Sequence, residues 1–297
     1  MRFGILLSAL GLVLFSAPAM AQDDAQYIYE PITIEKLSQF YWTINKMDIN
    51  NDLQIDNFLR VNECDIYNDY YHNEFEWKRV RESGRTFIGQ HKPSFPTRFE
   101  FMQPIRLTDY DFKTGKFGIL KGYQVNGVRR FEVYAQDTNA NVCGNKDELP
   151  DYQRGLAIEL NRPVVLTELA VEPKTAEQFI ASKTDKFKSL DDESENKKTL
   201  YNSRDAYIVF KFYGYSYTGE FEAQKDRKKL AGTLATLEGF DVYGDRDRKL
   251  LLHSENYLIK RELSDMEKKL IEEYEASKRP QETAPAQPAA PPPVATP

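Results

Sequence analysis

The sequence predicts an α+β protein, in which N-terminal helices precede a mostly antiparallel β-sheet system, a C-terminal helix and a disordered tail rich in Pro and Ala. Three observations lead to this class. Apolar residues recur at helical spacing between Thr33 and Met47. After Ser83-Gly84 the pattern changes to the period of two that is typical of strands. From Pro280 onward the chain consists mostly of Pro, Ala, Gln and Thr, a composition that does not form a packed core.

The N-terminus has the pattern of a secretory signal peptide. Arg2 precedes an apolar run from Phe3 to Phe15, and Ala19-Met20-Ala21 supplies a small-x-small cleavage site. The alternative, a membrane anchor, needs about 20 apolar residues, and this run is shorter. We therefore predict a signal peptide at residues 1–21, no membrane span after its cleavage, and export to the periplasm of a Gram-negative bacterium or, alternatively, secretion.

The charge of the chain argues against nucleic-acid binding. The formal net charge is −6, and it becomes −7 without the signal peptide, because Arg2 is the one charged residue in that segment. Binding to a phosphate backbone without sequence preference needs a basic face, so we predict no nucleic-acid partner.

Cys64 and Cys143 are the two cysteines of the chain. In an oxidising compartment an even pair predicts one disulfide. The alternative is two separate buried thiols. A reactive role has little support, since there is no Cys-x-x-Cys motif and no neighbouring histidine.

Two helices are expected in the N-terminal part. The first runs from Thr33, as its N-cap, to Met47. A polar segment from Asp48 to Asp56 follows, and a second helix is expected from Asp56, again as the N-cap, to Arg81. The second helix would bury Ile66 and Trp77 on its apolar face.

Turn residues separate the strands expected after Ser83-Gly84. Gly115 marks a turn, and Asn126-Gly127 predicts a type I′ hairpin between strands near 117–125 and 128–136. Strands are expected at 155–160 and 164–171, on either side of Asn161-Arg162-Pro163. A helix with a Thr175/Gln178 capping box is expected at 176–183, followed by a charged loop at 184–204. Two further strands, at 230–243 and 249–254, and a helix at 258–278 complete the expected elements.

The strongest strand signal is the stretch from Tyr207 to Tyr217. Because side chains alternate across a strand, one face would carry three large apolar residues and look into the core. The other face would carry the residues that we name as candidates for binding: Tyr207, Lys211, Tyr213, Tyr215 and Tyr217. Stacked tyrosines on an open strand can bind sugars or protein side chains, whereas the alternative is that a helix covers them.

These elements indicate one α+β domain at 28–278, which could divide near 184–204, and a disordered tail at 279–297. We predict that the core includes the following ten residues: Leu37, Ile66, Trp77, Phe131, Val133, Ile208, Phe210, Phe212, Leu234 and Phe240.

Motifs for metal, cofactor or catalytic chemistry are incomplete. Asp48-x-Asn50-x-Asp52 resembles the start of a calcium loop, but Leu53 and Leu59 stand where Gly and Glu are needed. His72 and Glu76 lie one helical turn apart, yet two ligands are too few for a zinc site. Asp241, Asp245 and Asp247 could ligate a cation, although a hairpin turn also uses such residues. We therefore name no catalytic residue, metal ligand or cofactor.

Short pieces of the chain resemble exported bacterial proteins of unknown function. They are the signal, the segment Glu63-Cys64-Asp65-Ile66-Tyr67 and the segment Tyr110-Asp111-Phe112. The resemblance implies neither an activity nor site residues.

Three hypotheses for function follow from the sequence. The first is a non-catalytic envelope protein that binds another protein or a glycan through the face of the stretch 207–217 that carries the tyrosines. The second is an envelope hydrolase with carboxylates that the sequence does not single out. The third is an accessory protein whose C-terminal helix recruits a partner. The first is preferred because the sequence contains no complete catalytic motif, which makes an enzyme the less favoured class.

Overall fold

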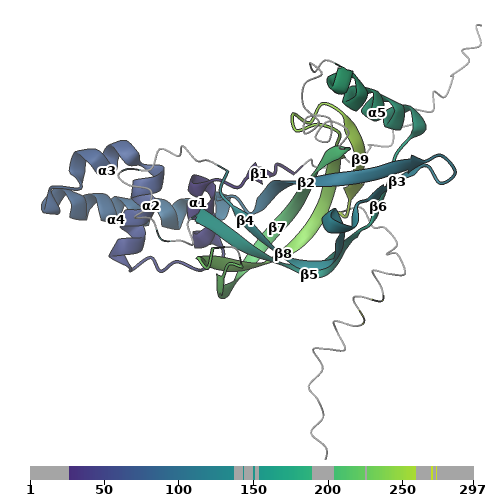
Figure 1. The fold of residues 1–297 in the computed structure, drawn as a ribbon. Helices are drawn as coiled ribbons and strands as arrows, with labels where there is room; N and C mark the ends of the chain where they lie inside the picture. The colour runs from purple at the N-terminus through teal and green to yellow at the C-terminus, as the bar shows by residue number, and fades with distance from the viewer. Residues whose placement is uncertain are drawn as a thin grey trace, which may run out of the picture.

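A computed structural model describes residues 27–136, 143, 150, 154–188, 204–224, 226–258, 269 and 272 (Figure 1). Helices and a nine-stranded sheet make up these parts of the chain, so the α+β class is confirmed. The elements are β1 (Glu30–Pro31), α1 (Ile34–Thr43), α2 (Asp52–Asn62), α3 (Cys64–Tyr70), α4 (Glu74–His91), β2 (Arg98–Asp111), β3 (Lys116–Ile119), β4 (Val125–Tyr134), β5 (Gly155–Leu166), β6 (Glu168–Ala170), α5 (Pro173–Lys188), β7 (Asp205–Glu222), β8 (Lys229–Tyr243) and β9 (Leu251–Asn256).

The sheet is mixed, which corrects the prediction of a mostly antiparallel system. Its strand order is β4-β5-β8-β7-β2-β3-β6, with β1 added beside β2 and β9 added beside β8. β5 runs parallel to β8, and β1 runs parallel to β2. The chain reaches β8 from β5 only after β6, α5 and β7, and such a long crossover is what a parallel pair requires.

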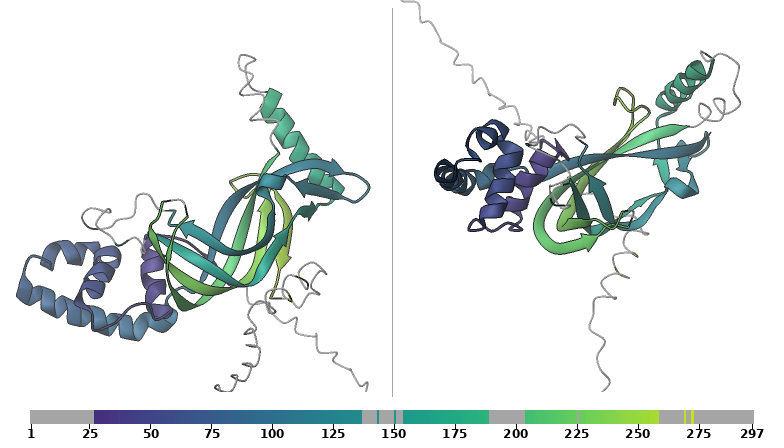
Figure 2. Two further views of the ribbon diagram at one scale, coloured as in Figure 1. Left: turned by 60° about the horizontal axis from the view of Figure 1, so that its bottom comes forward. Right: turned by 60° about the vertical axis from the view of Figure 1, so that its left-hand side comes forward.

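The sheet is strongly curled, and helices lie at its two ends (Figures 1 and 2). The helices α2, α3 and α4 form a group beyond α1 at one end, and α5 lies at the opposite end. We call the concave face, which carries Phe210 and Phe240 in the main core, the inner face of the sheet, and the opposite face the outer face.

The first helix and its Thr33 cap are confirmed, although the helix ends at Thr43 and not at Met47, and it is shared by two cores. The Thr33 hydroxyl caps α1 by accepting a hydrogen bond from the backbone N–H of Lys36. Phe40 and Tyr41 pack into the core of the sheet, whereas Trp42 packs into the core of the helical group. α1 therefore joins the helical group to the sheet.

The second expected helix is three helices, because Asn and not Asp supplies the caps. Asn51 caps α2 and Asn73 caps α4. Asp56 lies inside α2 with its carboxylate buried, so it is not an N-cap. Trp77 is buried as predicted, but Ile66 on the short helix α3 is 38% exposed, which corrects its place in the core.

Two turn predictions fail because the chain continues as a strand. Gly127 has a positive φ of 72°, but it lies at a β-bulge within β4 and not in a hairpin. Asn161-Arg162-Pro163 lies within the single long strand β5. Gly115, with a φ of 70°, does form the turn between β2 and β3, as predicted.

The helix expected at 176–183 is longer than its capping-box pattern suggests. α5 already begins at Pro173, so Thr175 lies inside it and not at its N-cap. The charged segment expected at 184–204 partly belongs to this helix, which extends to Lys188. The remainder of that segment, to residue 203, lies outside the described residues.

The centre of the main core is aromatic, and Phe210, from the stretch between Tyr207 and Tyr217, lies in it as predicted. The ring of Phe210 lies 5.1 Å from that of Phe101, 5.0 Å from that of Phe131 and 6.2 Å from that of Phe240. Of the ten predicted core residues, Ile66 is exposed and Leu234 is half-buried, whereas the other eight are buried.

The two cysteines form a disulfide, as predicted. It joins the start of α3 to a residue 79 positions later, and the Arg60 side chain donates a hydrogen bond to the Cys143 carbonyl. The expected signal peptide at 1–21, the tail at 279–297 and, apart from residues 258, 269 and 272, the helix at 258–278 lie outside the described residues. The domain limits at 28 and 278 stay predictions.

Candidate functional site

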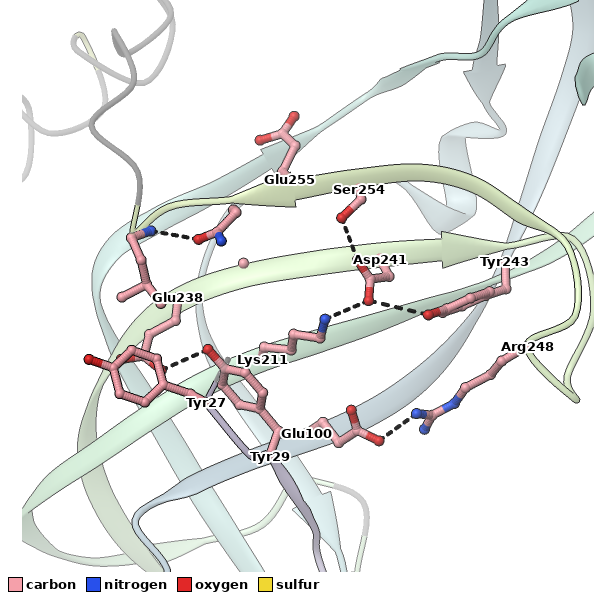
Figure 3. A pocket seen from close by; sticks show the side chains of 13 residues that line it. Tyr27, Tyr29, Glu100, Lys211, Glu238, Asp241, Tyr243, Arg248, Ser254 and Glu255 are labelled. Carbon is pink, nitrogen blue, oxygen red and sulfur yellow. Dashed lines mark hydrogen bonds and ion pairs between the residues drawn. The ribbon is translucent and has the colours of Figure 1, made fainter. Parts of the chain in front are cut away.

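A polar pocket of about 520 Å³ lies on the outer face of the sheet (Figure 3). Residues from β2, β7, β8 and β9 line it, together with the segment that leads into β1. We call it the outer-face pocket, and its central residues are Tyr29, Glu100, Lys211, Glu238, Asp241 and Tyr243. Most of its lining is polar, in contrast to the aromatic inner face of the same strands.

A β-bulge in β8 places Glu238 in the outer-face pocket. Lys211 pairs with Gly239, but the next residue of β7, Phe212, pairs with Leu237, so Glu238 is an extra residue in β8. Strict alternation from Phe240 would have turned Glu238 towards the inner face. Because a bulge adds one residue and bends the strand, it can direct this side chain to the opposite side.

Asp241 is the centre of one hydrogen-bond network in the pocket. The Lys211 ammonium and the Ser254 hydroxyl each donate to its carboxylate at 2.6 Å, and the Tyr243 hydroxyl donates at 3.3 Å. Asp241 is only 8% exposed. Burial, followed by the charge and hydrogen bond of Asp241, raises the pKa of Tyr243. Figure 3 shows these three donors converging on Asp241 from β7, β8 and β9.

Glu238 is the centre of a second network. The Arg98 guanidinium donates to both carboxylate oxygens, at 2.9 and 3.0 Å, and the Tyr29 hydroxyl donates at 3.0 Å. Glu238 is only 4% exposed. Burial, and then the hydrogen bond and charge of Glu238, raise the pKa of Tyr29 well above its usual range. The phenol therefore remains a hydrogen-bond donor at neutral pH.

A third ion pair closes the rim of the pocket. Arg248 donates to the Glu100 carboxylate at 2.5 Å (Figure 3). Arg248 belongs to the turn after β8, where Asp245 accepts hydrogen bonds from the backbone N–H groups of Lys249 and Leu250. Burial alone would raise the pKa of Asp245, but these bonds lower it. Asp245 therefore stabilises the turn, in line with the expectation that these residues form a hairpin turn. Asp241 instead lies within strand β8.

The five predicted binding residues do not share one face. Tyr207, Lys211 and Tyr213 alternate regularly on the outer face, and Lys211 lines the pocket. Gly214 pairs with Ala235 and Ser216 with Leu234, so Tyr215 is an extra residue at a bulge in β7. The bulge reverses the alternation beyond it, and Tyr217 packs against the main core, with the Lys46 ammonium 5.0 Å from its ring.

Tyr213 and Tyr215 form the exposed aromatic part of the outer face. Their rings are stacked with centroids 5.9 Å apart, and Tyr215 is 41% exposed. The guanidinium of Arg98 lies 4.8 Å from the ring of Tyr213 and 3.8 Å from that of Tyr27. Since Arg98 also holds Glu238, the stacked tyrosines and the outer-face pocket form one continuous surface.

Arg98, Glu238 and Tyr29 were not among the binding residues predicted from the sequence. A signal for Glu238 was present: two acidic residues, Glu238 and Asp241, stand three positions apart in the strand expected at 230–243, whose other residues are uncharged. An odd spacing cannot place both side chains on one face of a regular strand, so it indicates a bulge. Arg98 and Tyr29 come from distant segments and carry no comparable local signal.

A second concave region lies in the helical group. It is mostly apolar, measures about 650 Å³, and is lined by residues of α2, α3 and α4 that include Phe58, Ile66, Tyr70, Val80 and Phe87. It shares no lining residue with the outer-face pocket.

The described residues contain no group of three or more His, Cys, Asp or Glu side chains that could hold a metal ion. In the calcium-like segment, Asp48 accepts a hydrogen bond from the Asn50 backbone, and Asn51 caps α2. These contacts belong to a helix start. Within the same described ranges, no helix has the length and apolar character that crossing a bilayer requires.

Comparison with known proteins gives one match. A family model described as a domain of unknown function (DUF4852) matches residues 50–182, which run from just before α2 into α5. The match includes Arg98 and Glu100 but not β7, β8 or β9, which carry most of the outer-face pocket. No curated protein and no solved structure matches the chain.

Proposed function

We propose that the protein is an exported, non-catalytic binding protein of the cell envelope, and that it binds a protein or a glycan through the outer face of β2, β7 and β8. The observation that carries this proposal is the continuity of the stacked pair Tyr213 and Tyr215 with the outer-face pocket through Arg98. Aromatic rings beside an ordered polar pocket are what a recognition site needs: the rings supply contact area, and the polar groups fix orientation.

The arrangement of the acids favours binding over hydrolysis. In the outer-face pocket, Glu238 binds Arg98, Asp241 binds Lys211, and Glu100 binds Arg248. A carboxylate that is bound to a cation of its own chain is suited to positioning a ligand. Hydrolysis by a carboxylate pair instead needs one carboxyl that donates a proton and one that activates water. The His253 ring lies against Phe240, and its nitrogens contact the Ala170 carbonyl and Glu255.

The test replaces both tyrosines of the stacked pair with alanine. We expect the variant Tyr213→Ala/Tyr215→Ala to lose capture of an envelope protein or glycan, because each exposed aromatic anchor can contribute about 1–2 kcal/mol to binding. The matched control is Phe75→Ala/Phe112→Ala, which removes two more exposed aromatic rings from places outside the outer face. Pull-down and glycan-array binding measure the effect, and circular dichroism checks the fold. Unchanged capture by the folded double-tyrosine variant would overturn this surface.

The alternative, an envelope hydrolase, is tested on the same pocket. Glu238→Gln and Asp241→Asn preserve shape but remove a carboxylate. If either variant abolished a hydrolytic activity of the purified chain, the protein would be an enzyme, and the binding proposal would be wrong about its class.

A further inference from the structure

The outer-face pocket is polar, but its acidic side chains are paired with basic side chains of the same chain. Four acidic residues line it, and each is paired. Glu238 is bound to Arg98 at 2.9 Å, Asp241 to Lys211 at 2.6 Å and Glu100 to Arg248 at 2.5 Å, while the Glu255 carboxylate lies 3.4 Å from the His253 ring. Glu238 and Asp241 are also more than nine-tenths buried. The pocket therefore presents many hydrogen-bonding groups but little net charge.

On this basis we propose that the outer-face pocket binds a neutral, hydroxyl-rich ligand, that is, an uncharged carbohydrate. The inference rests on the proposed binding function and names its ligand class. A hydroxyl group both donates and accepts hydrogen bonds. It can therefore bridge a carboxylate oxygen and a neighbouring ammonium or guanidinium while their ion pair stays intact.

A charged ligand fits this pocket less well. A cationic ligand that took Asp241 would displace Lys211, and an anionic ligand that took Lys211 would leave Asp241 without its counter-ion. Breaking a buried pair is costly, because the remaining charge has lost both water and partner. The same argument applies to Glu238 and Arg98, whose bidentate geometry is fixed further by the Tyr29 hydroxyl.

Two tyrosines give the pocket a wall on which a sugar ring can lie. Tyr27 and Tyr29 come from the segment that leads into β1, and both line the pocket. The Arg98 guanidinium lies 3.8 Å from the centre of the Tyr27 ring, and the Tyr29 hydroxyl is held by Glu238. Figure 3 shows both rings beside Glu238 and Lys211. An amphipathic ring of this kind offers a flat apolar surface beside polar groups.

The experiment compares three oligosaccharides of equal length and different charge. Isothermal titration calorimetry of the full chain would use N-acetylated chitotetraose as the neutral probe, its deacetylated form as the cationic probe and tetragalacturonate as the anionic probe. We expect the neutral probe to bind at least about tenfold more tightly than either charged probe. Tighter binding of a charged probe would overturn the inference, as would the absence of binding by all three.

A charge substitution then tests the reason for this selectivity. Lys211→Met removes the cation from Asp241, so we expect the cationic probe to gain about tenfold or more in affinity. Arg248→Met removes the cation from Glu100 at the rim of the pocket. This variant replaces Lys211→Met in the experiment if Lys211→Met fails to fold. The matched control is Lys116→Met, which breaks the exposed ion pair with Glu168 on β3 and β6. An unchanged preference for the neutral probe in the folded variants would contradict the charge argument.

These outcomes separate the ligand class from the binding function. If no oligosaccharide binds but Tyr213→Ala/Tyr215→Ala still abolishes capture of a protein partner, the carbohydrate inference is wrong and the proposed binding function stands. If the neutral probe binds and Tyr29→Ala weakens it by about tenfold, the pocket and its ligand class are both supported.

Discussion

At the scale of single residues, the buried charges of this protein are held in small, complete networks. Asp56 in α2 accepts a hydrogen bond from the Trp77 indole N–H at 3.0 Å and from the Arg81 guanidinium at 2.6 and 2.5 Å. The two donors belong to α4, so one carboxylate joins two helices. In the sheet, Glu238 and Asp241 likewise each accept hydrogen bonds from donors on two other segments of the chain.

Replacing Asp56 by alanine should destabilise the helical group strongly. The substitution leaves the buried indole N–H and the partly buried guanidinium without their acceptor, which we expect to lower the free energy of unfolding by about 3 kcal/mol. Chemical denaturation followed by tryptophan fluorescence measures this loss. Asp69→Ala, at an exposed position of the neighbouring helix α3, should change stability by less than about 0.5 kcal/mol. Equal effects of the two substitutions would contradict the assigned network.

At the scale of elements, β-bulges decide which side chains meet. The bulge at Glu238 adds an acid to the outer face, and the bulge at Tyr215 sends Tyr217 to the core. β9 depends on a further local feature, because it lies very close to β8 at Gly239. A Cβ atom added at Gly239 would lie 2.3 Å from the backbone oxygen of Glu255.

Gly239→Ala should therefore displace β9. Backbone atoms cannot move aside as a flexible side chain can, and we expect a loss of about 2 kcal/mol together with the hydrogen bond between Ser254 and Asp241. Hydrogen exchange of the β9 amides, compared with those of β7, reports the displacement. In Gly122→Ala the new Cβ meets no atom within 4 Å, so this variant is the control. Wild-type protection of β9 in Gly239→Ala would show that the close approach is unimportant.

His253 ties β9 to β6, and its contribution should depend on pH. The hydrogen bond to Glu255, opposed by burial and assisted by the Ala170 carbonyl, raises the pKa of His253 above its ordinary value of 6.5. A raised pKa in the folded state means that protonation favours folding. The stabilisation is fully present below the unfolded-state pKa and is lost as the pH rises through the folded-state pKa.

We therefore expect His253→Ala to destabilise the protein more at pH 5.5 than at pH 8.5. The difference should be on the order of 1 kcal/mol or less, because the pair with Glu255 is partly screened by solvent. Thermal unfolding at both pH values measures it, with the exposed His72→Ala as the control. A larger effect of His253→Ala at pH 8.5 would reverse the sign and refute the assigned interactions.

At the scale of the whole molecule, helix α1 and the disulfide both join the helical core to the core of the sheet. Trp42 of α1 packs with Phe58 of α2 in the helical core, while Phe40 of the same helix packs with Phe99 of β2. The bridge between Cys64 and Cys143 ties α3 to a segment that lies between β4 and β5 in the chain. The helical group is therefore connected to the sheet by packing and by a covalent bond.

Removing the disulfide should destabilise the protein substantially. A loop closed by residues 79 positions apart corresponds to about 4.5 kcal/mol in the chain-entropy model. Cys64→Ser/Cys143→Ser should show this loss in chemical denaturation, and a reducing agent should produce a similar loss in the wild-type chain. The reducing agent should leave the double-serine variant unchanged, and any further loss there would point to another cause.

Local patterns were sufficient for the elements that depend on neighbouring residues. The apolar period and the Thr33 cap predict α1, and the density of aromatic and β-branched residues predicts β7 and its buried Phe210. The prediction of a single second helix was wrong because Asn51 and Asn73 are as suitable for an N-cap as Asp56 is. The sequence alone does not show which of these residues caps a helix. Ile66 was misplaced for the same reason, since its face depends on where α3 begins.

The α+β class, the inner face of β7 and the pair of cysteines that bond can all be predicted from the sequence alone. Period, propensity and residue type are local properties, and these features follow from them. Three features become visible only in the folded protein: β5 lies parallel to β8, the bulges place Glu238 outside and Tyr217 inside, and Arg98 and Tyr29 meet Glu238. Those outcomes depend on strand register and on contacts between segments that are far apart in the chain, which no local pattern encodes.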